Sequence, residues 1–265
     1  MPTIQANGIE LYYERSGSGP RVLYISGTGG DLRQKPGVSD GPLPARFDVL
    51  AYDQRGMGRA AKPDVPYSMA DYADDAAGLM DAVGWDDARV IGVSFGGMVA
   101  QNLVARHPER VERLVLCCTS PGGAGGASYP LHELGDLEGE ARASRMIPLL
   151  DTRKDSAWAA AHPQDYAQLL GLGSTDPFAH ETGHALGARR QIEARQGHDV
   201  WDALAKVRCP VLVAGGRYDG VALPETMKRM ADRIPRAQFR LFEGGHQFML
   251  EDPAAMPAII AFLEA

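Results

Sequence analysis

The stretch Gly92-Val93-Ser94-Phe95-Gly96 decides the fold of this chain. It follows an apolar run at residues 88–93 and precedes a helix-like segment at residues 97–107. A G-x-S-x-G pattern between a strand and a helix is typical of a sharp, strained turn that exposes a serine. The glycines fit this prediction, because side chains there would crowd the turn and the approach of helix to strand. A serine in an ordinary glycine-containing loop matches the same short pattern, so other parts of the chain are needed to distinguish the two interpretations.

Two further polar residues follow strand-like runs later in the chain. Asp219 comes after the apolar run 211–214, and His246 comes after the run 238–242. Open α/β sheets gather their chemistry just beyond the carboxyl ends of the strands, where both residues are expected. Taken singly, each residue is as consistent with a turn residue as with a catalyst. Together with Ser94, in the chain order Ser, Asp, His, they indicate a catalytic triad in the order of α/β-hydrolases rather than that of chymotrypsin or subtilisin.

On these stretches the chain resembles the α/β-hydrolase superfamily over nearly its whole length. The finer resemblance is to its enol-lactonase and methylesterase branch, and it is carried by the segments SGTGG, DQRGMG, GVSFGG, GGRYDG and EGGH. The resemblance implies a mostly parallel, twisted sheet flanked by helices, with an inserted helical cap. It also implies a serine hydrolase that cleaves a carboxylic ester or lactone of a small to medium apolar molecule through an acyl-enzyme, with no metal and no organic cofactor.

The glycine-rich turn at residues 27–30 follows a short buried run and resembles the oxyanion loop of the family. By this resemblance, the backbone N–H of Thr28 is the expected loop donor, with the two neighbouring glycines as alternatives, and the N–H of Phe95 is the second donor. The family usually has His-Gly where this chain has Ser26-Gly27, which leaves open how the loop is braced. A phosphate-binding loop is disfavoured, because no Gly-Lys-Ser/Thr follows.

The alternation of strands and helices is interrupted between residues 122 and 202. Four glycines fall within residues 121–126, amphipathic helical segments follow, and the core pattern resumes at Val207. We therefore predict one hydrolase core formed by residues 1–121 and 203–265, and a helical cap or lid at 122–202 that covers the pocket.

Two other segments are predicted to be structural. Residues 4–14 alternate apolar and polar side chains around Asn7-Gly8, which predicts an antiparallel hairpin at the sheet edge. In DQRGMG, Asp53 and Arg55 are expected to brace loops near the site. Asp74 and Asp75, which follow a predicted capping box at 68–71, are interpreted as a solvated helix face.

The predicted cap contains His180-Glu181-Thr182-Gly183-His184, which matches the zinc-protease pattern H-E-x-x-H. The metzincin extension requires a histidine where this chain has Arg190, and no third ligand sits at a family spacing. Gly183 also weakens the helix that would have to hold both histidines. The pattern therefore favours coincidence over a metalloprotease.

Composition narrows the remaining classes. The chain has 265 residues, and the hydrophobic share of 45% excludes a disordered protein. The net charge of −7 argues against nucleic acid and anionic membranes as partners. The N-terminus lacks a leader pattern and no apolar stretch reaches membrane-spanning length, so we expect a cytoplasmic protein, monomeric or homodimeric. The three cysteines are expected to be reduced, structural thiols.

Two alternatives to an esterase or lactonase remain open within the same fold. A cofactor-free perhydrolase, resembling haloperoxidases, uses the same triad and differs only in its pocket. A non-catalytic binding protein for small molecules can also have this fold, although such a role gives no reason to keep the serine, acid and histidine together.

Overall fold

The computed structural model describes residues 2–265 and contains an eight-stranded sheet in the order β1-β2-β4-β3-β5-β6-β7-β8. The first two strands, β1 (Thr3–Ala6) and β2 (Ile9–Gly17), pair antiparallel to each other, and β2 pairs antiparallel to β4. The other strands run parallel: β3 (Arg21–Ile25), β4 (Asp48–Asp53), β5 (Ala88–Val93), β6 (Val111–Cys117), β7 (Val211–Gly216) and β8 (Gln238–Phe242). This mostly parallel sheet confirms the predicted fold class.

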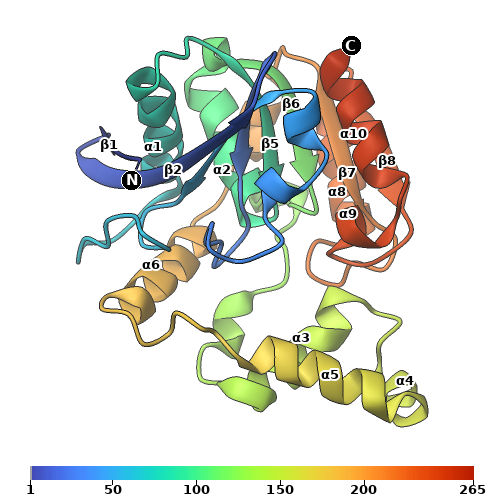
Figure 1. Cartoon of the computed structure of the whole chain (residues 1–265). Coiled ribbons are helices and arrows are strands. Elements are labelled where there is room, and N and C mark those ends of the chain that lie inside the picture. The colour runs from blue at the N-terminus through green and yellow to red at the C-terminus, as the bar shows by residue number, and fades with distance from the viewer. Residues whose placement is uncertain (1) are drawn as a thin grey trace.

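Helices cover both faces of the sheet (Figure 1). One face packs against α1 (Met69–Ala82), α2 (Phe95–Arg106) and α8 (Pro224–Arg233), which share one hydrophobic cluster with the strands. The other face packs against α9 (Phe248–Glu251) and α10 (Ala255–Glu264) through a second cluster. Because both faces are covered, the central strands β4, β6 and β7 are almost continuously buried, as expected for a parallel sheet.

The local signals in the sequence explain how these elements begin and end. The predicted hairpin forms, with Asn7 and Gly8 at φ 46° and 77° in its turn. The predicted capping box also forms, because the Ser68 hydroxyl accepts from the Asp71 N–H and the Asp71 carboxylate accepts from the Ser68 N–H. Short 3₁₀ helices occupy Val38–Asp40, Leu43–Ala45, Pro108–Arg110, Gly123–Gly125 and Leu131–Leu134.

The segment between β6 and β7 is mainly helical, and we call its residues 122–202, the predicted cap, the helical insertion. It contains α3 (Gly139–Leu150), α4 (Ser156–Ala161), α5 (Pro163–Ser174), α6 (His184–Gln196) and the start of α7 (Trp201–Leu204). In Figure 1, α3, α4 and α5 form a group below the sheet, whereas α6 lies apart from them on the side of α1. Gly122 and Asp199 form an isolated β-bridge, so the two ends of the insertion lie side by side.

The expectation that Asp75 belongs to a solvated face is wrong. Asp75 is fully buried, and Arg55 donates two hydrogen bonds to its carboxylate at 2.6 Å each. Asn7 donates to the same carboxylate at 2.9 Å, so the pair joins the hairpin turn, α1 and the segment after β4. Asp74 does lie at the surface, where it pairs with Arg106. Among the described residues, no helix is long and apolar enough to cross a membrane.

Candidate active site

The serine stands on a strained turn between β5 and α2. Ser94 has φ 55° and ψ −114°, an uncommon conformation for a residue with a side chain. A Cβ atom at Gly92 would lie 2.4 Å from the Gly96 carbonyl oxygen, and one at Gly96 would lie 2.1 Å from the Ile25 carbonyl oxygen. Only glycine therefore fits at both positions, and this close packing holds Ser94 at the carboxyl end of the sheet.

Ser94, His246 and Asp219 form one hydrogen-bonded line. His246 Nε2 lies 3.0 Å from Ser94 Oγ, and His246 Nδ1 lies 2.8 Å from Asp219 Oδ2. With the proton on Nδ1, the imidazole donates to the carboxylate and can accept the serine proton on Nε2. The structure thus brings together the three side chains that the sequence proposed as a triad.

Asp219 is fixed in place by its own loop. Its side chain is buried, and Oδ1 accepts hydrogen bonds from the backbone N–H groups of Val221 at 2.8 Å and Ala222 at 2.9 Å. These two bonds leave Oδ2 for His246. The carboxylate is therefore oriented before any ligand arrives, which is the arrangement that a histidine-orienting group needs.

The end of α3 braces the loops that carry the acid and the histidine. The Leu149 carbonyl accepts from the Gly220 N–H at 2.9 Å, and the Leu150 carbonyl accepts from the His246 N–H at 2.6 Å. A Cβ at Gly245 would lie 2.0 Å from the Leu150 oxygen, so the contact requires glycine there. Sequence reasoning did not find this brace, because nothing in a helical pattern shows where its end will dock.

The two expected oxyanion donors belong to segments that adjoin the nucleophile. The Phe95 N–H belongs to the first turn of α2, where backbone N–H groups have no acceptor inside the helix. The loop after β3 approaches from the other side, since a Cβ at Gly27 would lie 3.4 Å from the Cβ of Ser94. Within residues 2–265, no backbone or side-chain acceptor binds the Thr28 N–H. Both groups are therefore available to a ligand.

Two glutamines brace this loop in place of the missing histidine. Gln54 Nε2, fully buried after β4, donates to the Ser26 carbonyl at 2.8 Å. Gln191, buried on α6, accepts from the Gly29 N–H at 2.8 Å through Oε1. The second contact ties the helical insertion to the loop, and no feature of the sequence predicted it.

Besides Ser94, the side chain of Cys118 also lies close to Asp219 and His246. Its sulfur and ligand atoms of Asp219 and His246 all lie within 4.8 Å of one another, the one such group of potential metal ligands among the described residues. Burial, then the charges of Cys117 and Asp219, raise the pKa of the Cys118 thiol well above its ordinary value. A protonated, buried thiol is a poor nucleophile and a poor metal ligand.

The H-E-x-x-H segment does not form one helix. Gly183 has a left-handed conformation and caps α6, which begins at His184. Glu181 pairs with Arg33, and His184 Nε2 pairs with Asp176 at 2.9 Å. The two histidines therefore lack the shared helical face that a zinc protease requires, in line with the interpretation as coincidence.

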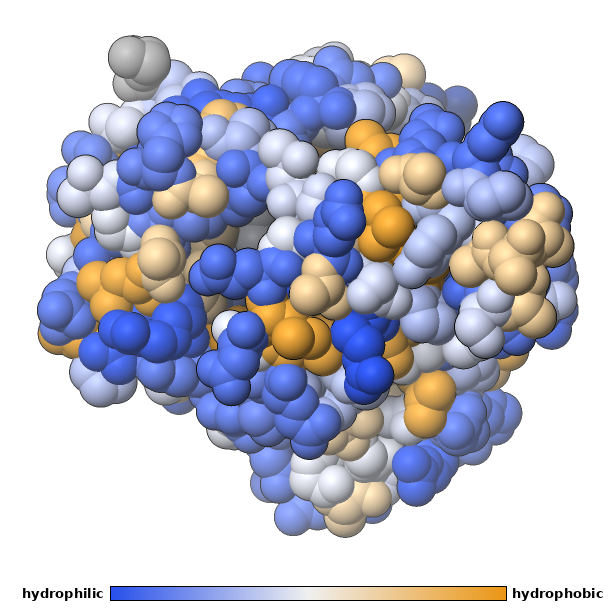
Figure 2. Space-filling view, turned by 90° about the horizontal axis from the view of Figure 1, so that it is seen from below, coloured by the Kyte–Doolittle hydropathy of each residue, from blue (hydrophilic) through white to orange (hydrophobic). Residues whose placement is uncertain are grey.

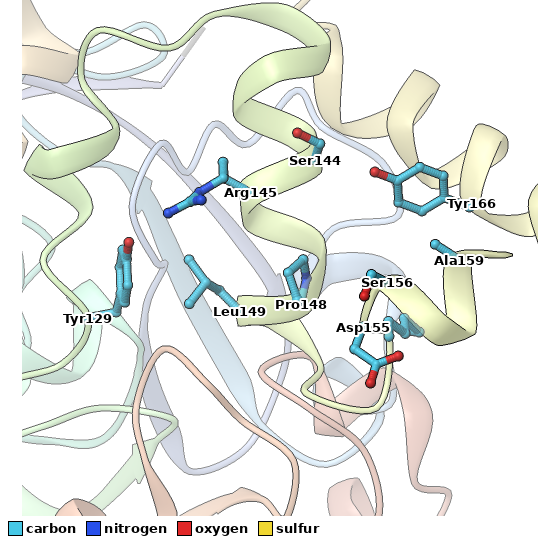
Figure 3. Close-up of a pocket in the computed structure, with 10 residues that line it drawn as sticks. Tyr129, Ser144, Arg145, Pro148, Leu149, Asp155, Ser156, Ala159 and Tyr166 are labelled. Carbon is cyan, nitrogen blue, oxygen red and sulfur yellow. The ribbon is translucent and has the colours of Figure 1, made fainter.

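Cavities lie along the helical insertion, and one of them reaches the oxyanion loop. One of about 690 Å³ reaches Thr28, Gly29 and Gln191 between the oxyanion loop and α6. Another, of about 350 Å³, lies within the insertion; Figure 3 shows Tyr129 and Arg145 on one side of it and Tyr166 on the other. Figure 2 views the molecule from this side, and its surface is mainly hydrophilic with separate hydrophobic spots.

The fold and this site define the class of protein. A family model described as alpha/beta hydrolase fold matches residues 20–253, and the chain belongs to that family. The hydrolase class follows from this membership together with the relatives described next.

Among sequences, the chain is 31% identical to a provisionally named carbamate hydrolase, RutD, of Caulobacter sp. (strain K31), over 82% of this chain and 81% of that protein. It is 30% identical to the 2-hydroxymuconate semialdehyde hydrolase of Pseudomonas sp. (strain CF600), over 97% of this chain and 91% of that protein. Among solved structures, the enol-lactonase from Burkholderia xenovorans LB400 is similar over 100% of both chains, with a TM-score of 0.79 and 26% identity.

Proposed function

We propose that this protein is a serine hydrolase that cleaves a carboxylic ester or lactone of a small molecule through an acyl-enzyme. The observation that carries the proposal is the hydrogen-bonded line from Ser94 through His246 to Asp219, with the serine on a strained turn at the start of a helix. Such an arrangement activates a weak nucleophile, and a purely structural serine has no need of it.

Each step of the reaction follows from a group in the site. His246 Nε2 takes the proton from Ser94 Oγ as the oxygen attacks the carbonyl carbon. The Asp219 carboxylate holds the Nδ1 proton and stabilises the imidazolium that forms. His246 then gives its proton to the leaving alkoxide. In the second half it takes a proton from the attacking water and returns that proton to Ser94 Oγ as the bond between Ser94 and the acyl group breaks.

The N–H groups of Phe95 and Thr28 are proposed to bind the oxyanion of the tetrahedral intermediate. In comparable sites, one such donor contributes about 2.7 to 4 kcal/mol to transition-state stabilisation. The loop positions of Gln54 and Gln191 support this role, because a donor stabilises the transition state only when it is held rigidly before the reaction.

The helical insertion is proposed to act as the cap over the pocket. Its α6 lines the cavity beside Thr28, and the end of α3 contacts both catalytic loops. A cap in this place excludes water and selects the substrate. The names of the relatives cover a carbamate, a semialdehyde and an enol-lactone, so they support hydrolysis in general and leave the bond type to experiment.

Labelling with a fluorophosphonate probe, followed by mass spectrometry, tests the proposal. We expect an adduct on Ser94 that is absent in Ser94→Ala, together with turnover of short 4-nitrophenyl esters. Panels of esters, lactones and carbamates then separate the bond types, and peroxide-dependent formation of a peracid faster than ester hydrolysis would favour the perhydrolase alternative. A folded wild-type protein that gives no adduct and no turnover contradicts the proposal.

A further inference from the structure

A third cavity, called here the Arg195 cavity, lies between α2 and the end of α6. It has a volume of about 350 Å³, and its lining includes Met98, Ser120, Ser128, Tyr129, Arg195 and His198. Its walls therefore come from α2, from the segments that follow β6, and from the end of α6.

Arg195 is buried in this cavity without a counter-ion. The residue is only 9% exposed, and its guanidinium donates one hydrogen bond, at 2.7 Å, to the neutral hydroxyl of Ser128. Within residues 2–265, no carboxylate oxygen lies within 4.0 Å of it. Burial alone lowers the pKa of Arg195 to about 10, which still leaves the group charged at neutral pH.

The neighbouring histidine adds no charge to the cavity. His198 is 7% exposed, and burial lowers its pKa to about 4, so the ring is neutral near pH 7. Its ring nitrogens are occupied, because Nδ1 lies 3.2 Å from the Asn102 amide nitrogen and Nε2 lies 3.0 Å from the Ser120 carbonyl. With the proton on Nε2, His198 donates to that carbonyl, and its own backbone N–H donates to the Arg195 carbonyl at 3.1 Å.

A buried guanidinium without a negative partner is unfavourable, because no attraction to an opposite charge offsets the loss of its hydration. The other buried arginine with such a position, Arg55, has a counter-ion, because two hydrogen bonds pair it with Asp75. The free N–H groups of Arg195 and its flat fork suit a carboxylate, which accepts two parallel hydrogen bonds. We infer that the Arg195 cavity binds a carboxylate carried by the substrate.

For this role, one small substrate must reach both the cavity and the nucleophile, and two walls of the cavity belong to segments that are hydrogen-bonded to the Ser94 backbone. The Met98 N–H donates to the Ser94 carbonyl at 3.3 Å, so the wall at Met98 stands one helical turn, roughly 6 Å along α2, from the nucleophile. The wall at Ser120 follows the strand whose Cys117 carbonyl accepts from the Ser94 N–H. The substrate is then an ester or lactone with a carboxylate a few bonds from the reacting carbonyl.

This inference rests on the proposed function, and it replaces the apolar substrate expected from the sequence with one that carries a negative charge. It also predicts an unusual stability effect: Arg195→Met should leave the melting temperature unchanged or raise it, because an uncompensated buried charge is removed. An arginine with a purely structural role would give a lower melting temperature in this variant.

Binding tests the cavity independently of catalysis. Isothermal titration of the Ser94→Ala protein with monomethyl glutarate should give measurable affinity, and dimethyl glutarate should bind at least about 10-fold more weakly. Adding Arg195→Met should weaken the binding of monomethyl glutarate by about 10- to 100-fold, and Arg195→Lys should reduce the affinity less. Equal affinities for the two esters, or no effect of Arg195→Met, would overturn the inference.

Kinetics tests the link to the nucleophile. Mono-(4-nitrophenyl) glutarate and 4-nitrophenyl pentanoate differ mainly in one carboxylate, and we expect Arg195→Met to reduce kcat/KM for the first by about 10- to 100-fold while changing the second by less than about 3-fold. The matched control is Arg190→Met on the same helix, since Arg190 is paired with Glu193 at 2.9 Å. Equal losses on both esters would mean that Arg195 is structural.

The two proposals can fail separately. Labelling of Ser94 and turnover without any preference for the carboxylate overturn the anion site and leave the serine hydrolase intact. Arg195-dependent binding of monomethyl glutarate without labelling or turnover overturns the hydrolase and keeps the anion site.

Discussion

Two histidines of this protein are each held between two partners, yet only one of them contacts a carboxylate and a serine hydroxyl. His246 lies between the Asp219 carboxylate and the Ser94 hydroxyl, whereas His198 lies between the Asn102 amide and the Ser120 carbonyl. Both rings are mostly shielded from solvent. The difference is in the partners: a carboxylate supports a positive ring and a hydroxyl can give up a proton, while an amide and a carbonyl do neither. Chemistry at a histidine is thus set by its neighbours more than by its burial.

The largest effect should come from removing the reacting groups. Ser94→Ala or His246→Ala should each reduce kcat by about 10⁴- to 10⁶-fold, because either change removes the activated nucleophile as a unit. Stopped assays with 4-nitrophenyl esters at high enzyme concentration measure the residual rate, and circular dichroism checks the fold. A loss below 100-fold for both variants would show that His246 is no more special than His198.

The next effect concerns the partner that distinguishes the two rings. Asp219→Asn should keep the bonds from Val221 and Ala222 but direct an amide N–H at His246 Nδ1, which forces the proton onto Nε2. The ring then cannot accept the proton of Ser94, and kcat should fall by roughly 10⁴-fold. Asp219→Glu serves as a charge-preserving comparison in the same assay, and a variant as active as wild type would contradict the role of the carboxylate.

A smaller effect should appear in stability for His198. Its folded pKa of about 4 lies below the ordinary 6.5, so the unfolded chain binds the proton more readily. The associated stability is complete above pH 6.5 and is lost as pH falls to 4, by about 3 kcal/mol. Urea unfolding at several pH values should show this loss in wild type and a flatter profile in His198→Gln. The exposed His180→Gln is the matched control and should follow wild type.

The smallest effect should come from the contact between α6 and the oxyanion loop. Gln191→Ala removes the acceptor of the Gly29 N–H and should lower kcat by about 10-fold with little change in KM, because it loosens a donor that acts in the transition state. Gln164→Ala, an exposed position on α5, is the control. A change confined to KM, or equal changes in both variants, would assign Gln191 to substrate binding or to no role.

The core half of the site could be predicted from sequence for a physical reason. Parallel strands end at one edge of the sheet, so residues that follow them, such as Ser94, Asp219 and His246, must meet there. The hairpin around Asn7-Gly8 was equally accessible, because turn chemistry is local.

The other contacts of the site could not be predicted from the sequence, also for physical reasons. Asp75 was misjudged although it lies three residues after the core residue Tyr72, on the same face of α1, because its partner Arg55 is 20 residues away in the chain. Gln191, Arg195 and His198 gave no signal, since their roles depend on where the helical insertion folds back. The division into core and cap stays a prediction.

The brace formed by Leu149 and Leu150 limits how this protein can be remodelled. Two consecutive carbonyls of the insertion hold the backbones at Gly220 and His246. An exchange of residues 122–202 for the equivalent segment of a relative therefore transplants part of the catalytic scaffold along with the substrate pocket. We expect a chimera with new specificity to keep its rate only if Leu149 and Leu150 remain those of the host protein.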